Sequence, residues 1–345
     1  MTQARGYAAQ TAKAPLAPWT FSRRAVGPQD VAINIRYCGI CHSDLHQARD
    51  EWGGALFPMV PGHEITGVVT QVGPQVTALK VGDPVGVGCM VNSCRTCPSC
   101  LRGDEQYCDG PVSWTYNGLE QDRTTPTYGG YSDHIVVDSR FVLRIPTGMP
   151  LDAAAPLLCA GITTYSPLKH WRVGAGHRLG VIGLGGLGHM AVKLGVAMGA
   201  HVTVFSRSDA KRADTRRLGA HEYVATDGGV TGLKKSFDFL LDTVSAPHSI
   251  EDLLECLKTD GTLILVGVPE KPYAVGAGSL IMQRRRLVGS LIGGIRETQE
   301  MLDFCGAQNV VSDIEVIPMQ QVNKAYERLL KADVRYRFVL DLSTL

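Results

Sequence analysis

The chain has 345 residues, of which 44% are hydrophobic and 19% charged, and its mean hydropathy is +0.01. This composition is typical of a folded globular protein and excludes a disordered or fibrous chain, and the length favours two domains over one. The 34 basic and 33 acidic residues give a net charge of +1, so no overall field attracts a nucleic acid or an anionic membrane. We therefore expect a small molecule as the partner.

Residues 1–19 contain Pro15 and Pro18 and lack the unbroken apolar core of a signal peptide. We expect a cytoplasmic protein, whose ten cysteines serve as metal ligands or reactive thiols before disulfides. The most apolar stretch, residues 179–205, includes charged residues and glycines. It predicts a buried strand, helix and strand, in preference to a membrane span.

The first part of the chain, between about residues 31 and 145, shows short alternating runs separated by glycine and proline, which predict a strand-rich domain. The clearest runs are Val31 to Tyr37, Gly67 to Val72 and His134 to Val137. We place this domain at residues 1–151 and assign the tail, residues 295–345, to it as well.

Residues 152–294 alternate short apolar runs with helical patterns, which predicts an α/β domain with a Rossmann doubly wound parallel sheet. The expected strands are Leu179 to Ile182, Val202 to Phe205, Glu222 to Ala225, Phe237 to Asp242, Thr262 to Val266 and Leu287 to Leu291. In the tail we expect a charged helix from near Glu297, a strand at Ile314 to Ile317, a helix at Val322 to Lys331 and a strand at Arg337 to Leu342.

The strongest chemical signal is a group of four closely spaced cysteines: Cys94, Cys97, Cys100 and Cys108. Two successive two-residue gaps let thiolates turn onto one tetrahedral zinc, and a short loop supplies the fourth ligand. Four sulfur ligands leave no open position, so the site would be structural. An iron–sulfur cluster and four unrelated cysteines are the alternatives.

Three further positions resemble metal ligands only weakly by themselves. They are Cys41, His63, which Glu64 follows, and Cys159. A lone cysteine is more often a small buried hydrophobic residue, and a lone histidine a hydrogen-bonded polar one.

A glycine-rich turn follows the apolar run that ends at Ile182. It reads Gly183-Leu-Gly-Gly-Leu-Gly188, and a helical pattern from Met190 to Met198 comes next. Strand, glycine turn and helix in this order form the dinucleotide fingerprint, in which backbone amides approach the pyrophosphate at the helix N-terminus. The alternative is a tight turn without a ligand.

The next expected strand ends without the acidic residue that reads the ribose 2′-hydroxyl of NAD. It ends in Ser206 and Arg207, and Lys211 follows. These side chains can bind and neutralise a 2′-phosphate, which predicts NADP as the cofactor. A solvated basic turn, with Asp209 nearby, is the alternative.

Together these motifs resemble the zinc-containing medium-chain alcohol dehydrogenases, most closely the cinnamyl alcohol dehydrogenase branch with its bacterial broad-specificity aldehyde reductases. The resemblance covers nearly the whole chain. It implies a GroES-like catalytic domain beside the Rossmann domain. The segments that carry it are Gly39 to His46, Pro61 to Glu64, the four-cysteine lobe, Pro156 to Gly161 and the glycine turn.

The resemblance implies that Cys41, His63 and Cys159 bind a catalytic zinc, so that we expect about two zinc ions per chain. Zinc would polarise the substrate oxygen while hydride moves between carbon and the nicotinamide. The resemblance further implies that Ser43 exchanges a proton with the substrate oxygen and that the cofactor ribose passes this proton towards His46. Asp44 would orient His63, and Glu64 would approach the metal.

The cofactor contacts that the resemblance implies are His42 at the pyrophosphate, together with Thr163, Gly183, Gly185, Gly186, Leu187, Gly188, Ser206, Arg207, Lys211 and Val268. Trp114 resembles the aromatic pocket wall of the cinnamyl branch, although it could equally belong to the core. We expect a wide apolar pocket for aromatic and medium aliphatic aldehydes, with reduction as the cellular direction.

Three other classes of protein share some of these sequence features. A zinc-free quinone or enoyl reductase would have no use for the cysteines, and a nucleic-acid zinc ribbon would need a basic face that the lobe lacks. A polyol dehydrogenase shares the zinc and the fold and differs mainly in pocket polarity. The strand at Leu287 to Leu291 would lie at a sheet edge, where the family pairs across a two-fold axis, so we expect a homodimer.

Overall fold

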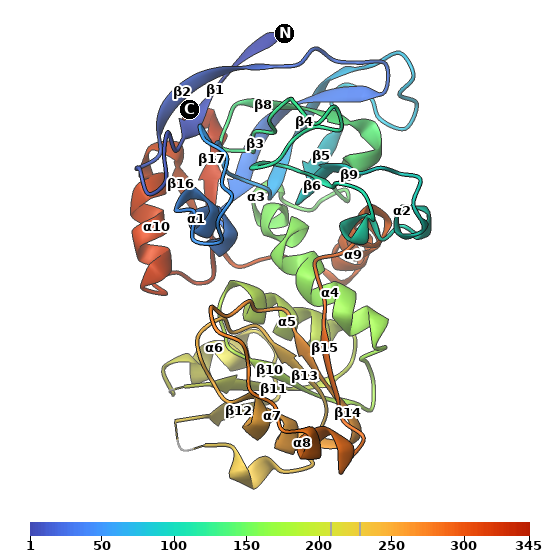
Figure 1. Cartoon of the computed structure of the whole chain (residues 1–345), viewed down its shortest axis with the longest axis vertical. Helices are drawn as coiled ribbons and strands as arrows, with labels where there is room; N and C mark the ends of the chain where they lie inside the picture. Colours follow the sequence, from blue (N-terminus) through green and yellow to red (C-terminus); the bar gives the residue numbers. More distant parts are fainter. Residues whose placement is uncertain (208, 228) are drawn as a thin grey trace. The chain divides into compact units, whose positions relative to one another are not determined.

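The computed structural model describes residues 1–207, 209–227 and 229–345. The chain divides into two compact units, Met1–Ile162 with Gly293–Leu345 and Thr163–Ile292. The sequence predicts boundaries at 151/152 and 294/295, which lie eleven residues before and two residues after the divisions between these units. Figure 1 shows both units, with the C-terminal elements α10 and β17 in red among the elements of the first unit.

The first unit contains most of the strands, in short pieces as the alternating runs predict. Its strands are β1 (Thr2–Ala8), β2 (Ala17–Arg23), β3 (Asp30–Gly39), β4 (Ile65–Val72), β5 (Pro84–Val87), β6 (Met90–Asn92), β7 (Ser113–Trp114), β8 (His134–Asp138), β9 (Leu143–Arg144), β16 (Ile314–Pro318) and β17 (Arg337–Asp341). Its helices are α1 (His42–Ala48), α2 (Pro98–Arg102), α3 (Leu151–Ala154), α9 (Ile295–Gln308) and α10 (Val322–Leu330).

The main sheet of this unit has the order β16-β17-β3-β4-β5-β9, and β8 also pairs with β3. Strand β17 pairs antiparallel with β3, placing Leu340 opposite Cys38. The tail therefore returns to the first domain, as expected. Helix α10 buries Val322, Ala325 and Leu329 on one face, which is the spacing of an amphipathic helix.

The second unit is a six-stranded parallel sheet in the order β12-β11-β10-β13-β14-β15. Its strands are β10 (Arg178–Ile182), β11 (His201–Ser206), β12 (Glu222–Ala225), β13 (Phe237–Asp242), β14 (Leu257–Leu265) and β15 (Arg286–Gly289). The helices are α5 (Gly186–Ala197), α6 (Arg212–Arg217), α7 (Ile250–Cys256) and α8 (Ala277–Ile281), and α4 (Ala160–His170) begins in the first unit.

This sheet confirms the doubly wound α/β prediction, and each expected strand is present with end shifts of a few residues. Strand β14 differs most, because it begins at Leu257, before the expected Thr262. The core around the central strands contains buried side chains such as Phe205, Phe237 and Leu240. Buried on both faces, such strands consist of nearly continuous apolar residues, which is why the sequence revealed them.

In the described part of the chain, every helix is too short or too polar to span a lipid bilayer. The apolar stretch at residues 179–205 is β10, α5 and β11, as expected.

Candidate active site and cofactor site

The four cysteines of the lobe converge around one point. Their sulfur atoms all lie within 4.8 Å of one another, and Cys94 Sγ to Cys100 Sγ and Cys97 Sγ to Cys108 Sγ are both 3.9 Å. A tetrahedral zinc with bonds of about 2.3 Å holds its sulfur ligands about 3.8 Å apart. The spacing therefore fits a single zinc ion, whereas an iron–sulfur cluster would need more room between the thiolates.

Backbone amides point at these sulfur atoms. The amide of Cys97 donates to Cys94 Sγ at 3.4 Å, that of Cys100 to Cys97 Sγ at 3.5 Å, and that of Asp109 to Cys97 Sγ at 3.4 Å. Hydrogen bonds from the backbone, with that of Thr96 the largest contribution, lower the pKa of Cys94 to about 6. Thiolate, the form that binds metal, is thus favoured there.

A second group brings together residues from distant parts of the first unit. Ligand atoms of Cys41, His63, Glu64 and Cys159 lie within 4.8 Å of one another. Cys41 precedes helix α1, and Cys159 follows the single turn Ala155–Leu158. A hydrogen bond from Cys159 lowers the pKa of Cys41 well below its usual range.

Asp44 holds this group in place from behind. Its fully buried carboxylate accepts hydrogen bonds from the amide of Cys41 at 2.8 Å and the amide of Gly62 at 3.0 Å. It also lies 3.0 Å from His63 Nδ1 and 3.2 Å from the hydroxyl of Tyr131. With Nδ1 directed at the carboxylate, Nε2 of His63 is left for a metal ion.

Glu64 is also fully buried and forms an ion pair with Arg337, which is 4% exposed. Glu64 Oε2 has no hydrogen-bond partner among the described residues. Burial, opposed by the charge of Arg337, raises the pKa of Glu64 to about 7. An unpaired carboxylate oxygen beside two thiols and an imidazole fits a site built for a cation.

Helix α1 presents the other polar residues expected at this site. Ser43 Oγ lies 3.6 Å from Cys41 Sγ, and His46 is half-buried with Nδ1 2.5 Å from Glu51 Oε2. The ring of His46 stacks on Trp52 at 5.1 Å. His42 is exposed.

In the second unit the glycine turn lies between β10 and α5, as predicted. Gly183 has φ +87°, and a Cβ on Gly188 would lie 2.1 Å from the carbonyl oxygen of Gly183. A Cβ on Gly185, in contrast, would meet no atom within 4 Å. Gly183 and Gly188 are required by the backbone, whereas Gly185 leaves open space at the start of α5 where a phosphate can approach. Gly186 and Leu187 form the first turn of α5.

Of the basic residues after β11, Lys211 contacts this turn. Ser206 ends β11, Arg207 is exposed, and Lys211 Nζ donates to the carbonyl oxygen of Leu184 in the glycine turn at 2.6 Å. Lys211 therefore approaches the turn that the sequence pattern assigned to the cofactor. The other two expected contacts are Thr163, which is buried in α4, and Val268, which is 67% exposed after β14.

Trp114 is partly buried in the short strand β7, where it pairs with Met90 of β6. The segment Leu119 to Tyr128 forms a hairpin-like loop, in which Asp122 accepts hydrogen bonds from the amides of Thr124 and Thr125.

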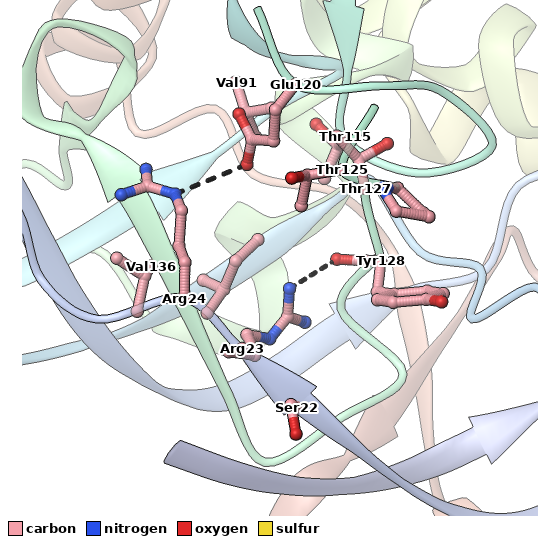
Figure 2. Close-up of a pocket in the computed structure, with 12 residues that line it drawn as sticks. Ser22, Arg23, Arg24, Val91, Thr115, Glu120, Thr125, Thr127, Tyr128 and Val136 are labelled. Carbon is pink, nitrogen blue, oxygen red and sulfur yellow. Dashed lines mark hydrogen bonds and ion pairs between the residues drawn. The ribbon is translucent and has the colours of Figure 1, made fainter. Parts of the chain in front are cut away.

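This loop covers a small polar cavity of about 40 Å³. Figure 2 shows Arg24 pointing at Glu120 across the cavity and Arg23 donating to the backbone of Tyr128. Its volume suffices for ordered water. The cavity shares no lining residue with the two cysteine groups.

Sequence reasoning missed Arg337 and the tyrosines around the candidate metal-ligand group, which consists of Cys41, His63, Glu64 and Cys159. Tyr131 donates to Asp44, and the ring of Tyr116 stacks on His63 at 5.7 Å. Arg337 was expected only as the first residue of a strand. A basic residue opening an otherwise buried strand was the one available signal, because an unpaired buried arginine is very costly.

Comparisons with known proteins agree with this geometry. An alcohol dehydrogenase GroES-like domain matches residues 27–147, and a zinc-binding dehydrogenase domain matches residues 186–307. NADP-dependent alcohol dehydrogenase C 1 of Mycolicibacterium smegmatis is 57% identical, covering 100% of this chain and 99% of that protein. Aldehyde reductase YahK of Escherichia coli is 54% identical, covering 98% and 97%. The crystal structure of CAD from Helicobacter pylori complexed with NADP(H) has a TM-score of 0.94 at 43% identity, covering 99% of each chain.

Removing one lobe sulfur tests whether the four cysteines bind zinc. We expect Cys100→Ala to lose about one zinc ion per chain and to be unstable or insoluble, because an incomplete tetrahedral site cannot hold the lobe. Metal analysis and thermal unfolding measure both effects. Cys305→Ala, which truncates a buried thiol of the same unit, is the control and should keep its zinc. A stable Cys100→Ala protein with full zinc content would contradict the assignment.

Weakening the support of His63 tests the role of Asp44. Asp44→Asn should reduce the affinity of the catalytic site for zinc about 10- to 100-fold, the usual effect of losing a carboxylate behind a histidine ligand. Competition with a chelator measures this. Asp133→Asn is the matched control, since Asp133 Oδ1 lies 2.7 Å from Nδ1 of His134 in a partly buried pair outside the candidate metal site. Equal zinc retention by both variants would be evidence against the role.

Proposed function

Since the chain belongs to the zinc-containing medium-chain alcohol dehydrogenases, we propose that Cys41, His63 and Cys159 hold the zinc at which a primary alcohol and its aldehyde are interconverted with NADP(H). The observation that carries this proposal is the convergence of these three side chains, with His63 oriented by the buried Asp44. Three protein ligands leave one position for the substrate oxygen, as catalytic zinc sites require.

When bound, zinc polarises the substrate oxygen, and NADP(H) gives or takes the hydride. The protein's own contribution is orientation and charge. Asp44 keeps Nε2 of His63 facing the ligand group, and the ion pair with Arg337 holds Glu64 within reach of it. We assign Glu64 to the metal site as the carboxylate that approaches the ion when the substrate position is empty.

Ser43 and His46 are the proposed residues for proton movement. Ser43 Oγ lies beside Cys41 Sγ, so its hydroxyl can exchange a proton with a substrate oxygen held at the same site. His46 lies on the same short helix with its ring half-exposed and paired with Glu51, so it can exchange a proton with solvent.

For the cofactor, the glycine turn is the proposed pyrophosphate site, with Ser206, Arg207 and Lys211 at the 2′-phosphate. The position of Lys211 on the carbonyl of Leu184 supports this assignment. The fuller proposed set adds His42, Thr163 and Val268.

The proposed substrates are aromatic and medium aliphatic aldehydes, reduced in the cell, with Trp114 as an apolar wall. The proposed assembly is a homodimer through β15, which is an edge strand of the sheet and follows the exposed Ile281 and Met282 in the chain. The proposed location is the cytoplasm.

Steady-state kinetics with benzaldehyde and hexanal test the function and the catalytic zinc together. We expect turnover with NADPH and about two zinc ions per chain. Cys159→Ser should abolish turnover, retain about one zinc and still bind NADPH, whereas Cys256→Ser, a buried thiol of the second unit, should behave as wild type. Undiminished activity of Cys159→Ser would remove Cys159 from the metal site. Turnover of sugar alcohols alone would identify a polyol dehydrogenase.

Charge reversal at Arg207 tests the assignment of the 2′-phosphate. Arg207→Asp should weaken NADPH binding at least about tenfold more than NADH binding, each factor of ten being about 1.4 kcal/mol. Arg216→Asp makes the same charge change on α6 and is the control. Parallel weakening of both cofactors in Arg207→Asp would show that Arg207 does not read the phosphate.

A further inference from the structure

A buried carboxylate at the end of the central strand β13 anchors the loop that follows it. Asp242 is 1% exposed, and its Oδ1 accepts from the amide of Val244 at 3.0 Å. Its Oδ2 lies 2.9 Å from Nε2 of His248. The other ring nitrogen of His248, Nδ1, lies 2.8 Å from the carbonyl oxygen of Ala246. One side-chain pair thus closes residues 243–248 into a compact loop.

Both nitrogens of His248 face oxygen atoms, so both hydrogen bonds can form only when the ring is protonated. The hydrogen bond to Asp242 accordingly raises the pKa of His248, against the effect of burial. The titratable groups that face it are Asp242 from β13 and Tyr273, whose ring lies 5.5 Å away. Asp242 and His248 therefore form an ion pair. Because Asp242 is almost fully buried, salt screens this pair less than it screens a pair at the surface.

The anchored loop packs directly on the glycine turn. Thr243 donates to the carbonyl oxygen of Ile182 through its amide at 3.1 Å and its hydroxyl at 2.7 Å. A Cβ on Gly183 would lie 2.6 Å from Val244 Cγ2, and one on Gly267 would lie 2.6 Å from the carbonyl oxygen of Val244. Thr243 and Val244 thus fill the space between two backbone segments, and a shift of the loop must move the turn.

We propose that Asp242 and His248 are positioning residues for the cofactor, because their ion pair fixes the loop 243–248 and, through Thr243 and Val244, the backbone of the glycine turn. The inference rests on the proposed assignment of that turn to the pyrophosphate. Backbone amides stabilise an anion best when they are held in place before it binds, so a loosened turn binds the dinucleotide less tightly. Neither residue needs to touch the cofactor.

Cofactor binding by the zinc-loaded protein, measured by fluorescence titration, tests this. His248→Ala should raise the Kd of NADPH and of NADH by the same factor, about tenfold, as for the loss of one charge-assisted hydrogen bond. Equal factors distinguish this role from phosphate recognition at Arg207. His248→Gln retains an N–H donor for Asp242 and should recover most of the affinity.

The pH dependence of cofactor affinity gives a second test, because a purely structural role of His248 would not make the affinity depend on its protonation. The protonated ring is the form that completes both hydrogen bonds, so wild-type affinity should be highest at lower pH and fall as pH rises through the raised pKa of His248. Titration between about pH 7 and 9 stays above the pKa of the cofactor's 2′-phosphate, which is about 6 for such groups. This fall should be absent in His248→Ala and in His248→Gln.

His201→Ala is the matched control. Nε2 of His201 lies 3.1 Å from Glu222 Oε1. This histidine–carboxylate pair lies in the same sheet, at the N-terminal ends of β11 and β12, whereas the glycine turn follows the C-terminal end of β10. It should bind both cofactors as wild type does. Hydrogen exchange of the cofactor-free protein should show faster exchange at residues 183–188 and 243–248 in His248→Ala only.

Wild-type affinity and pH profile in both His248 variants, with NADPH bound normally by the wild-type chain, would overturn the positioning role and leave the proposed function intact. Equal losses in His201→Ala would also overturn it, by showing a general effect on the unit. Failure of the wild-type chain to bind either cofactor would overturn the assignment of the glycine turn, and this inference with it.

Discussion

The two oxygens of the Asp44 carboxylate hold together the parts of the chain that form the metal-ligand group. Removing a carboxylate from water costs several kcal/mol unless donors replace the lost hydration. In this protein the donors come from the amides of Cys41 and Gly62, the ring of His63 and the hydroxyl of Tyr131. The start of α1, the turn before β4 and the loop before β8 are therefore tied to one another by the need to satisfy a single buried charge.

A second buried charge depends on the end of the chain. Strand β17 pairs with β3 in the main sheet of the first unit and thereby carries Arg337 to Glu64. Each of these groups would be strongly destabilising alone, since neither is exposed to solvent. The C-terminal segment is thus part of the metal-ligand environment, although it is far from it in sequence. The four-cysteine lobe, by contrast, is closed by residues that are neighbours in the chain.

In the second unit, the backbone of the glycine turn also depends on residues that are distant in the chain. The glycine turn is tight enough that a Cβ on Gly188 would collide with the carbonyl of Gly183, and it is supported from one side by Thr243 and Val244. If the turn binds the pyrophosphate as proposed, its backbone amides are positioned by the segments packed around it. The pair of Asp242 and His248 supplies that support from the adjacent strand.

The sequence by itself determined the features whose parts are close together in the chain. The four-cysteine lobe, the turn at Gly183 to Gly188 and the buried strands of the parallel sheet all depend on spacing or on short-range apolar patterns. Cys41, His63 and Cys159 were grouped only through family resemblance, since nothing local links them. Tertiary structure alone decided that the buried charges of Glu64 and Arg337 meet. The physical reason is that such pairs form where distant strands are brought side by side, and no periodicity along the chain records that.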